Sequence, residues 1–167
     1  MKISEVIGSD PKIESISSKD IPIIRDMAIN QFEHNLATSE ILHTLNTDVD
    51  WSISKKLVVD DKIIGFFLFN EKNINDIVPP EYALEDLSKY DRPGIEGIML
   101  MVLPEYRGRG LGNCLKDLAS TFRGKYDYGF GQQLKNLNNL NDWLKRSRLV
   151  GELPDFGGIY VTLADLK

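Results

Sequence analysis

The stretch LMVLPEYRGRGLGN, residues 100–113, decides how the rest of the chain is interpreted. A run of mostly apolar residues, 95–103, leads into it and is typical of a central strand covered on both faces. Apolar residues at helical spacing follow, over residues 111–122. Between the two stand three glycines, Gly108, Gly110 and Gly112. The sequence therefore predicts a strand, a tight turn and a helix.

This turn has the composition of an anion site. Without Cβ atoms in the way, the backbone N–H groups of the glycines can converge, and the following helix adds its unpaired amides and the positive end of its dipole. Arg107 and Arg109 would add positive charge at the rim. The spacing G-x-G-x-G differs from the dinucleotide fingerprint G-x-G-x-x-G, and the Lys-Ser/Thr that ends a P-loop is missing. The alternative is a glycine-rich turn that binds nothing.

Two motifs here resemble the signature of the GNAT N-acetyltransferase superfamily. The cofactor loop of that family reads Arg/Gln-x-x-Gly-x-Gly/Ala, and residues 107–112 read R-x-x-G-x-G. The flanking V-x-P-x-Y-R-G at residues 102–108 also matches, as does the order of elements over nearly the whole chain. The resemblance implies that the chain binds acetyl-CoA, or a related acyl-CoA, as co-substrate and needs no metal.

The resemblance also implies individual cofactor contacts. The pantetheine arm would pair with the backbone of Leu100, Met101 and Val102, in a slot where residues 98–102 splay from the strand at 126–130. Asn138 is a weaker candidate, because residues 132–136 look like extra length. The loop residues expected around the pyrophosphate are Arg107, Gly108, Arg109, Gly110, Leu111, Gly112 and Asn113.

Acetylation of an amine requires a base, for which Glu96 is the candidate. Glu96 lies in the most apolar strand, where members resembling the histone-acetyltransferase branch carry a general-base Glu. The alternative is a carboxylate at the solvated end of that strand. The family's usual acid is a Tyr on the last helix, but Lys145 stands at that position here. Tyr126 or Tyr128 could replace it as acid or line the acceptor slot.

The expected fold class is α/β, with the element order β-α-α-β-β-β-α-β-α-β-β. Asp60 and Asp61 divide two β-rich runs and indicate a hairpin. We therefore expect one central mixed sheet with helices on both faces, in a single domain over residues 1–167. Strands are predicted at residues 12–17, 55–59, 62–69, 95–103, 126–130, 150–153 and 159–163, and helices at 20–32, 38–45, 111–122 and 137–145.

One connection is unusually long. Residues 70–94 are polar and are broken by Pro79, Pro80 and Pro93. A segment of this length without regular structure is either a functional lid or a mobile surface insertion.

The composition of the chain indicates which binding partners and which cellular location to expect. The net charge of -5 argues against general nucleic-acid binding. Residues 1–92 carry 10 Lys and Arg against 17 Asp and Glu, whereas residues 93–167 carry 10 against 8. This asymmetry suits an anionic cofactor and a cationic acceptor. No apolar run approaches a membrane span and no secretory signal is visible, so we expect a cytoplasmic protein that binds no membrane.

Three other residues are assigned structural roles. Cys114 cannot form an internal disulfide as the single cysteine, and we expect a small buried thiol rather than an acyl carrier. His34 and His43 lie nine residues apart with no third ligand near them, so we expect surface or helix-packing histidines rather than metal ligands.

The sequence thus predicts a transferase: an acyl-CoA-dependent N-acetyltransferase that moves an acetyl group directly to a primary amine. The acceptor would be a cationic small molecule, a protein lysine or a protein N-terminus. The alternative is a catalytically silent CoA-binding sensor or interaction module of the same fold. The sequence leaves monomer and homodimer open.

Overall fold

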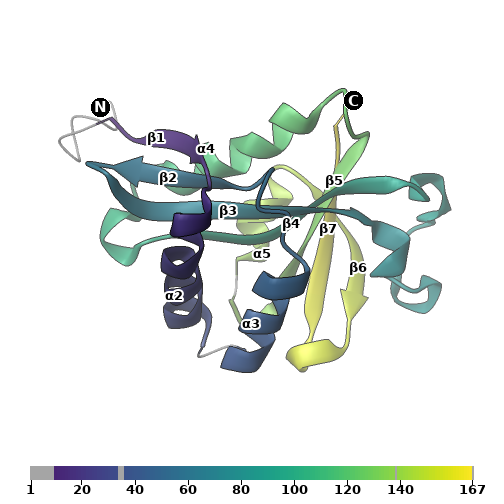
Figure 1. Cartoon of the computed structure of the whole chain (residues 1–167). Coiled ribbons are helices and arrows are strands. Elements are labelled where there is room, and N and C mark those ends of the chain that lie inside the picture. The colour runs from purple at the N-terminus through teal and green to yellow at the C-terminus, as the bar shows by residue number, and fades with distance from the viewer. Residues whose placement is uncertain (1–9, 34–35, 138, 167) are drawn as a thin grey trace. The chain divides into compact units, whose positions relative to one another are not determined.

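The computed structural model describes residues 10–33, 36–137 and 139–166. Its strands form a mixed sheet of seven in the order β1-β2-β3-β4-β5-β7-β6 (Figure 1). The pairs β1–β2, β2–β3, β5–β7 and β6–β7 are antiparallel, and β4–β5 is parallel. The expected α/β fold with a mixed sheet is confirmed. No helix in the described residues is apolar over enough length to span a membrane.

The chain divides into two compact units, and each is described separately. The first comprises Met1–Asn70 and Ile98–Leu118, and the second comprises Glu71–Gly97 and Ala119–Lys167. Strands β3 and β4 belong to both. The elements that lie wholly or partly in the first unit are β1 (Lys12–Ser15), α2 (Ile21–Phe32), α3 (Thr38–Thr47), β2 (Lys55–Val59), β3 (Lys62–Asn73), β4 (Pro93–Val102) and α4 (Leu111–Lys116).

The core of the first unit lies between α2, α3 and one face of the strands. It contains Ile24, Ala28, Ile41, Leu45, Phe66, Leu68, Met99 and Met101. Gly65 faces the other way, because side chains alternate along a strand. A Cβ on Gly65 would lie 2.6 Å from the Met101 carbonyl oxygen and 3.5 Å from Leu115 of α4. Helices therefore cover both faces of this part of the sheet, as predicted.

Two local features stabilise the first unit, a hairpin turn and a hydrogen-bonded carboxylate at the start of α2. Asp60 and Asp61 both adopt positive φ, 49° and 61°, as a two-residue hairpin turn requires, so the predicted hairpin is confirmed. At the start of α2, the Asp20 carboxylate accepts a hydrogen bond from the Ser17 N–H at 2.8 Å and one from Lys56 Nζ at 2.7 Å. Burial alone would raise the pKa of Asp20, but these hydrogen bonds outweigh it and lower the pKa to about 2.

The second unit contains β5 (Tyr128–Leu134), α5 (Leu140–Leu144), β6 (Arg148–Leu153) and β7 (Ile159–Asp165). The strand expected at 126–130 begins later and continues to Leu134, because pairing with β7 runs from Tyr128 to Leu134. Residues 132–134 are therefore strand and not extra loop length. Two predicted helices are shorter than expected: residues 117–122 form a 3-10 helix after α4, and α5 covers only Leu140–Leu144.

The connection after β3 is packed into the core and is not a loose surface insertion. Strand β3 extends to Asn73, and short 3-10 turns at Ile74–Asp76, Pro80–Tyr82 and Ser88–Tyr90 follow. We call residues 74–92 the insertion. Its buried residues, Ile74, Val78, Leu87 and Tyr90, share a core with Tyr128, Phe130, Val150, Leu153, Ile159, Val161 and Leu163. The insertion is thus an integral part of the second unit.

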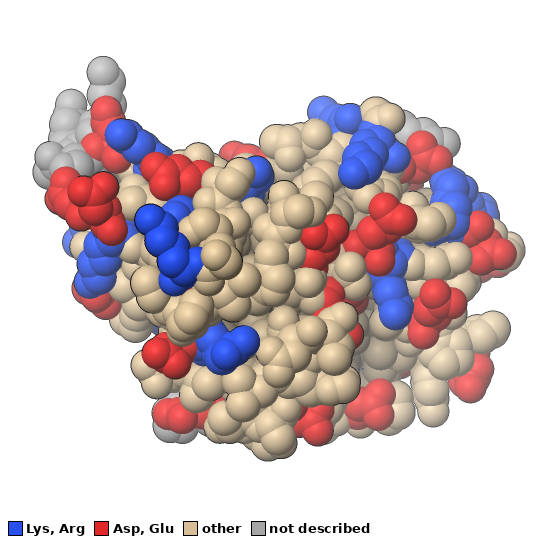
Figure 2. Space-filling model, in the orientation of Figure 1, with Lys and Arg blue, Asp and Glu red and all other residues tan. Residues whose placement is uncertain are grey.

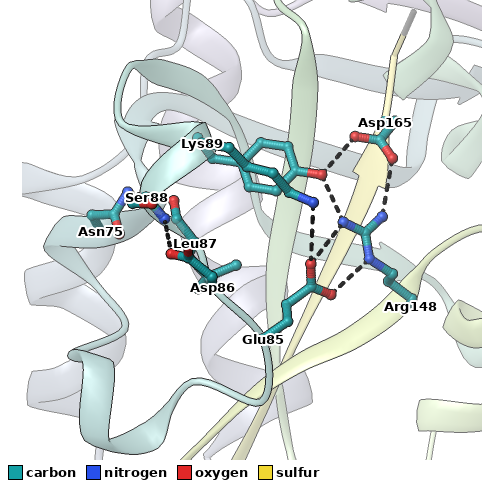
Figure 3. A network of polar contacts seen from close by, with 9 residues as sticks. Asn75, Glu85, Asp86, Leu87, Ser88, Lys89, Arg148 and Asp165 are labelled. Carbon is teal, nitrogen blue, oxygen red and sulfur yellow. Dashed lines mark hydrogen bonds and ion pairs between the residues drawn. The ribbon is translucent and has the colours of Figure 1, made fainter.

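A polar network ties the insertion to β6 and β7 (Figure 3). Arg148 donates to both carboxylate oxygens of Glu85, from Nε at 2.8 Å and from Nη2 at 3.2 Å. It also donates to Asp165 at 3.0 Å and to the Tyr90 hydroxyl at 2.6 Å, and that hydroxyl donates to Asp165 at 2.9 Å. Backbone pairing adds a bond from the Leu84 N–H to the Val150 carbonyl.

Candidate functional site

The predicted pantetheine-binding residues lie at the end of β4. Met101 and Val102 are buried and Leu100 is half-buried. The next residue, Leu103, donates its N–H to the Ile64 carbonyl at 2.8 Å, so the strand stays attached to β3 up to the turn. Pairing of β4 with β5 joins Ile95–Gly97 to Gly129–Gly131. This ladder includes none of residues 98–102, which we expected to splay from the strand at 126–130, since Gly129 and Phe130 pair with Ile95 and Glu96.

The glycine turn has the backbone that the motif predicts. Gly108 and Gly110 adopt left-handed conformations with φ of 77° and 80°, which glycine favours. Gly110 caps the N-terminus of α4 and accepts a hydrogen bond from the Cys114 N–H at 3.1 Å. Apart from its chain neighbours and its own helix backbone, a Cβ on any of the three glycines would meet no atom of the described residues within 4 Å. Gly112 also lacks a positive φ, so no contact among the described residues requires glycine there.

The side chains around the turn differ in what they face. Leu111 is 1% exposed and anchors α4 in the core, whereas Asn113 is exposed. Arg109 lies over the Tyr106 ring, with 5.6 Å between its guanidinium carbon and the ring centroid. Arg107 was expected to add charge at the rim, but its guanidinium has two protein acceptors, the Val102 carbonyl at 2.8 Å and Gln31 Oε1 at 2.7 Å.

Glu96 is a buried carboxylate. It is 7% exposed, which excludes the alternative of a solvated strand end. Its neighbour across the β4–β5 ladder is Phe130, and Gln132 on the same strand donates Nε2 to Glu96 Oε2 at 3.1 Å. A buried carboxylate in this position is a candidate for the proton transfer that a general base performs.

The two tyrosines considered as replacement acids are both engaged. Tyr128 is fully buried, its hydroxyl donates to the Arg92 carbonyl at 2.6 Å, and it accepts from the Ile74 N–H at 3.0 Å. Burial raises the pKa of Tyr128 above its ordinary value. The Tyr126 hydroxyl donates to the Glu71 carboxylate. Tyr128 therefore holds the two ends of the insertion.

The remaining predicted residues are less informative. Lys145 is exposed, and its Nζ lies 3.6 Å from the Asp142 carboxylate. Cys114 is half-buried rather than buried. Asn138 and His34 lie outside the described residues. Groups of three or more His, Cys, Asp or Glu side chains that could hold a metal ion are absent from the described part of the chain.

On the face drawn in Figure 2, basic and acidic side chains are interspersed among uncharged ones and form no broad field of one sign.

Sequence reasoning missed Gln31 and Gln132 as partners of predicted site residues. Gln31 is 76 residues from Arg107, and Gln132 is 36 residues from Glu96. No local pattern signals either contact, because both depend on the packing of distant elements.

Comparisons of sequence found no protein-family model and no curated protein that matches the chain. Comparison of structures found many similar folds. NAA60 of Arabidopsis thaliana in complex with acetyl-CoA is 18% identical, with a TM-score of 0.68, and the match covers 94% of this chain and 99% of that one. Naa50 of the same plant, in complex with the bisubstrate analogue CoA-Ac-MVNAL, is 13% identical, with a TM-score of 0.64 and coverage of 92% and 97%.

A GNAT-family acetyltransferase from Streptococcus agalactiae is 11% identical, with a TM-score of 0.66 and coverage of 94% and 96%. The matches span almost the full length of both partners. The chain therefore has the GNAT fold, and the resemblance seen in its sequence is confirmed at the level of the fold.

Proposed function

We propose that the chain is an N-acetyltransferase that uses acetyl-CoA or a related acyl-CoA. The observation that carries this proposal is the glycine turn after β4, where Gly112 has no side chain although no contact among the described residues requires glycine there. A ligand that approaches the backbone would explain it. The same fold holds acetyl-CoA in NAA60 of Arabidopsis thaliana.

The proposed binding roles combine the family resemblance with the open backbone of the glycine turn. The amides of residues 108–113 would bind the pyrophosphate, with Arg109 as the nearby cation. The backbone of Leu100, Met101 and Val102 would bind the pantetheine arm. Leu111 would contribute its amide alone, since its side chain is buried.

Glu96 is proposed as the base. It would take a proton from the acceptor ammonium, directly or through water, so that a neutral amine nitrogen can attack the thioester carbonyl. A new C–N bond forms, the C–S bond breaks, and the nitrogen of the intermediate loses a proton, which the CoA thiolate takes up, directly or through water, to leave as a thiol. The Naa50 complex, with an acetylated peptide joined to CoA, makes peptide N-termini the first acceptors to test.

A silent CoA-binding protein is the second candidate, because the usual acid position holds Lys145 and the Tyr128 hydroxyl is engaged with the backbone. Two measurements separate the candidates: calorimetric titration with CoA, and the rate at which CoA is produced from acetyl-CoA in the presence of peptides, lysine peptides or small amines. An enzyme binds CoA and produces it from acetyl-CoA faster when an acceptor is added. A silent binder binds CoA but transfers nothing, and a chain that fails to bind CoA refutes both.

A further inference from the structure

Arg107 connects the glycine turn to a distant helix. Its Nε donates to the carbonyl of Val102, the last residue of β4, and its Nη2 donates to Gln31 Oε1 near the end of α2. The distances are 2.8 Å and 2.7 Å, both short for N–H···O hydrogen bonds. One side chain therefore joins the end of a strand, the start of the turn and a helix, all within the first unit.

The position of Arg107 gives this link its effect. Two backbone bonds, from Tyr106 N–H to Leu103 and from Arg107 N–H to Pro104, already close the turn that precedes Gly108. Through its bond to the Val102 carbonyl, the Arg107 guanidinium then holds residues 103–107 against the end of β4. The residues that follow include glycines, which have the greatest conformational freedom of any residue. Where their amides point thus depends on how firmly Arg107 is held.

We propose that Gln31 is a positioning residue for the pyrophosphate of CoA. It holds the Arg107 guanidinium against the end of β4 and so keeps the amides of residues 108–112 in place before the ligand arrives. A preorganised site loses less conformational entropy on binding, which raises affinity. The inference rests on the proposed function, since it requires that the turn bind CoA.

Because Arg107 is positively charged, it could instead bind the phosphate directly. If Gln31 merely diverted the guanidinium from a direct contact with phosphate, its removal would strengthen CoA binding. If it positions the turn, its removal weakens CoA binding. The sign of the change in affinity therefore decides between the two arrangements.

The test compares Gln31→Ala with Asn30→Ala, a change of similar kind at an exposed position of the same helix. Without ligand, hydrogen exchange at the amides of residues 108–112 should be faster in Gln31→Ala and unchanged in Asn30→Ala. Calorimetry should show CoA binding about three- to tenfold weaker in Gln31→Ala, which corresponds to losing one net hydrogen bond. Gln31→Glu keeps an oxygen acceptor of the same reach and should restore the slow exchange.

Two CoA fragments show which part of the ligand is affected. Dephospho-CoA keeps the pyrophosphate, so its affinity should fall by the same factor as that of CoA. S-acetylpantetheine lacks the pyrophosphate, and its kcat/KM as acyl donor should be the same in Gln31→Ala and wild type. Equal losses for both fragments would mean a general structural defect and would overturn the inference.

The outcomes separate this inference from the proposed function. If the wild type does not bind CoA, both fail. If the wild type binds CoA and Gln31→Ala binds it equally or more tightly, only the role of Gln31 is overturned. Thermal unfolding of each variant shows whether the fold is intact, and exchange at residues 108–112 remains measurable in either case.

Discussion

The two segments that flank β4 are built by opposite means. The insertion, which leads into β4, is held by side chains: its apolar residues are buried, and Glu85 and Tyr90 are bound to Arg148. The turn that follows β4 is made of glycines whose missing side chains would meet only open space. The insertion packs its side chains into a core, whereas the glycine turn leaves its backbone accessible to a ligand.

This difference implies that the segment before β4 contributes mainly to stability and the segment after β4 mainly to ligand binding. A segment whose polar groups are paired within the protein contributes to the fold and has little left for a ligand. A turn with open backbone contributes little to the fold and can bind an anion. Glu96 lies on β4 between them, and the predictions below test whether chemistry, binding and stability are separable in this way.

The largest effect is expected from Glu96→Gln. A general base contributes about 10²- to 10⁴-fold, so kcat/KM should fall by that amount while the CoA dissociation constant and the unfolding free energy stay near wild type. Initial rates with saturating acetyl-CoA provide the measurement. Glu152→Gln, an exposed glutamate on β6, is the control. A kcat/KM for Glu96→Gln within a few-fold of wild type would assign the base to another group.

The next effect concerns the open turn. Gly112→Val puts a side chain where the pyrophosphate would approach, and Gly110→Asp adds a repelling charge at a left-handed position. We expect CoA affinity to fall by at least about tenfold with the fold retained, as calorimetry and circular dichroism would show. Gly124→Asp is the matched control, because Gly124 also has positive φ and open space outside the turn. Equal losses in Gly110→Asp and Gly124→Asp would contradict the assignment of the turn.

The insertion should respond in the opposite way. Arg148→Met leaves Glu85, Asp165 and Tyr90 without their shared donor. Because the Arg148 side chain is 40% exposed, we expect a moderate loss of about 1–3 kcal/mol in unfolding free energy. Urea unfolding measures it, with Arg123→Met, an exposed cation of the same unit, as control. A large loss of CoA affinity in Arg148→Met would show that the two segments are not independent.

The contrast between the glycine turn and the insertion also explains which parts of the structure the sequence predicts. The glycine turn and the Asp60–Asp61 hairpin were predicted correctly because residue type alone sets their backbone conformation. The packing of the insertion was missed, since its buried residues Ile74, Val78, Leu87 and Tyr90 form two separate pairs, and a single pair is too short to reveal a period. Arg148 and Glu85 are 63 residues apart, and only the folded chain brings them together.

A smaller effect is expected from pH. The hydrogen bond from Arg148 lowers the pKa of Glu85. Burial raises the pKa of Asp165, but hydrogen bonds from Tyr90 and Arg148 outweigh it, so its pKa is also lowered. Groups with lowered pKa in the folded state stabilise it above their unfolded pKa, and this contribution is lost as pH falls through the folded values.

The unfolding free energy of the wild type should therefore decrease below about pH 4, and the decrease should be shallower in Arg148→Met. Urea unfolding from about pH 6 to about pH 3 measures both slopes. Asp20, whose pKa is lowered to about 2 by Lys56 and Ser17 against the effect of burial, supplies the same trend in the first unit. Arg148→Met should leave that share intact. Parallel slopes in wild type and variant would mean that the network does not contribute.

The smallest effect is expected from Cys114→Ala. If the turn acts through its backbone, the half-buried thiol in α4 has no chemical part, although its N–H bonds to Gly110. Alanine keeps that N–H and suits a helix, so activity should stay within about twofold of wild type. Direct transfer also requires both substrates on the protein together, so initial-rate plots should intersect. Parallel lines with an acyl group trapped on Cys114 would instead assign the acyl transfer to the thiol of Cys114 in α4.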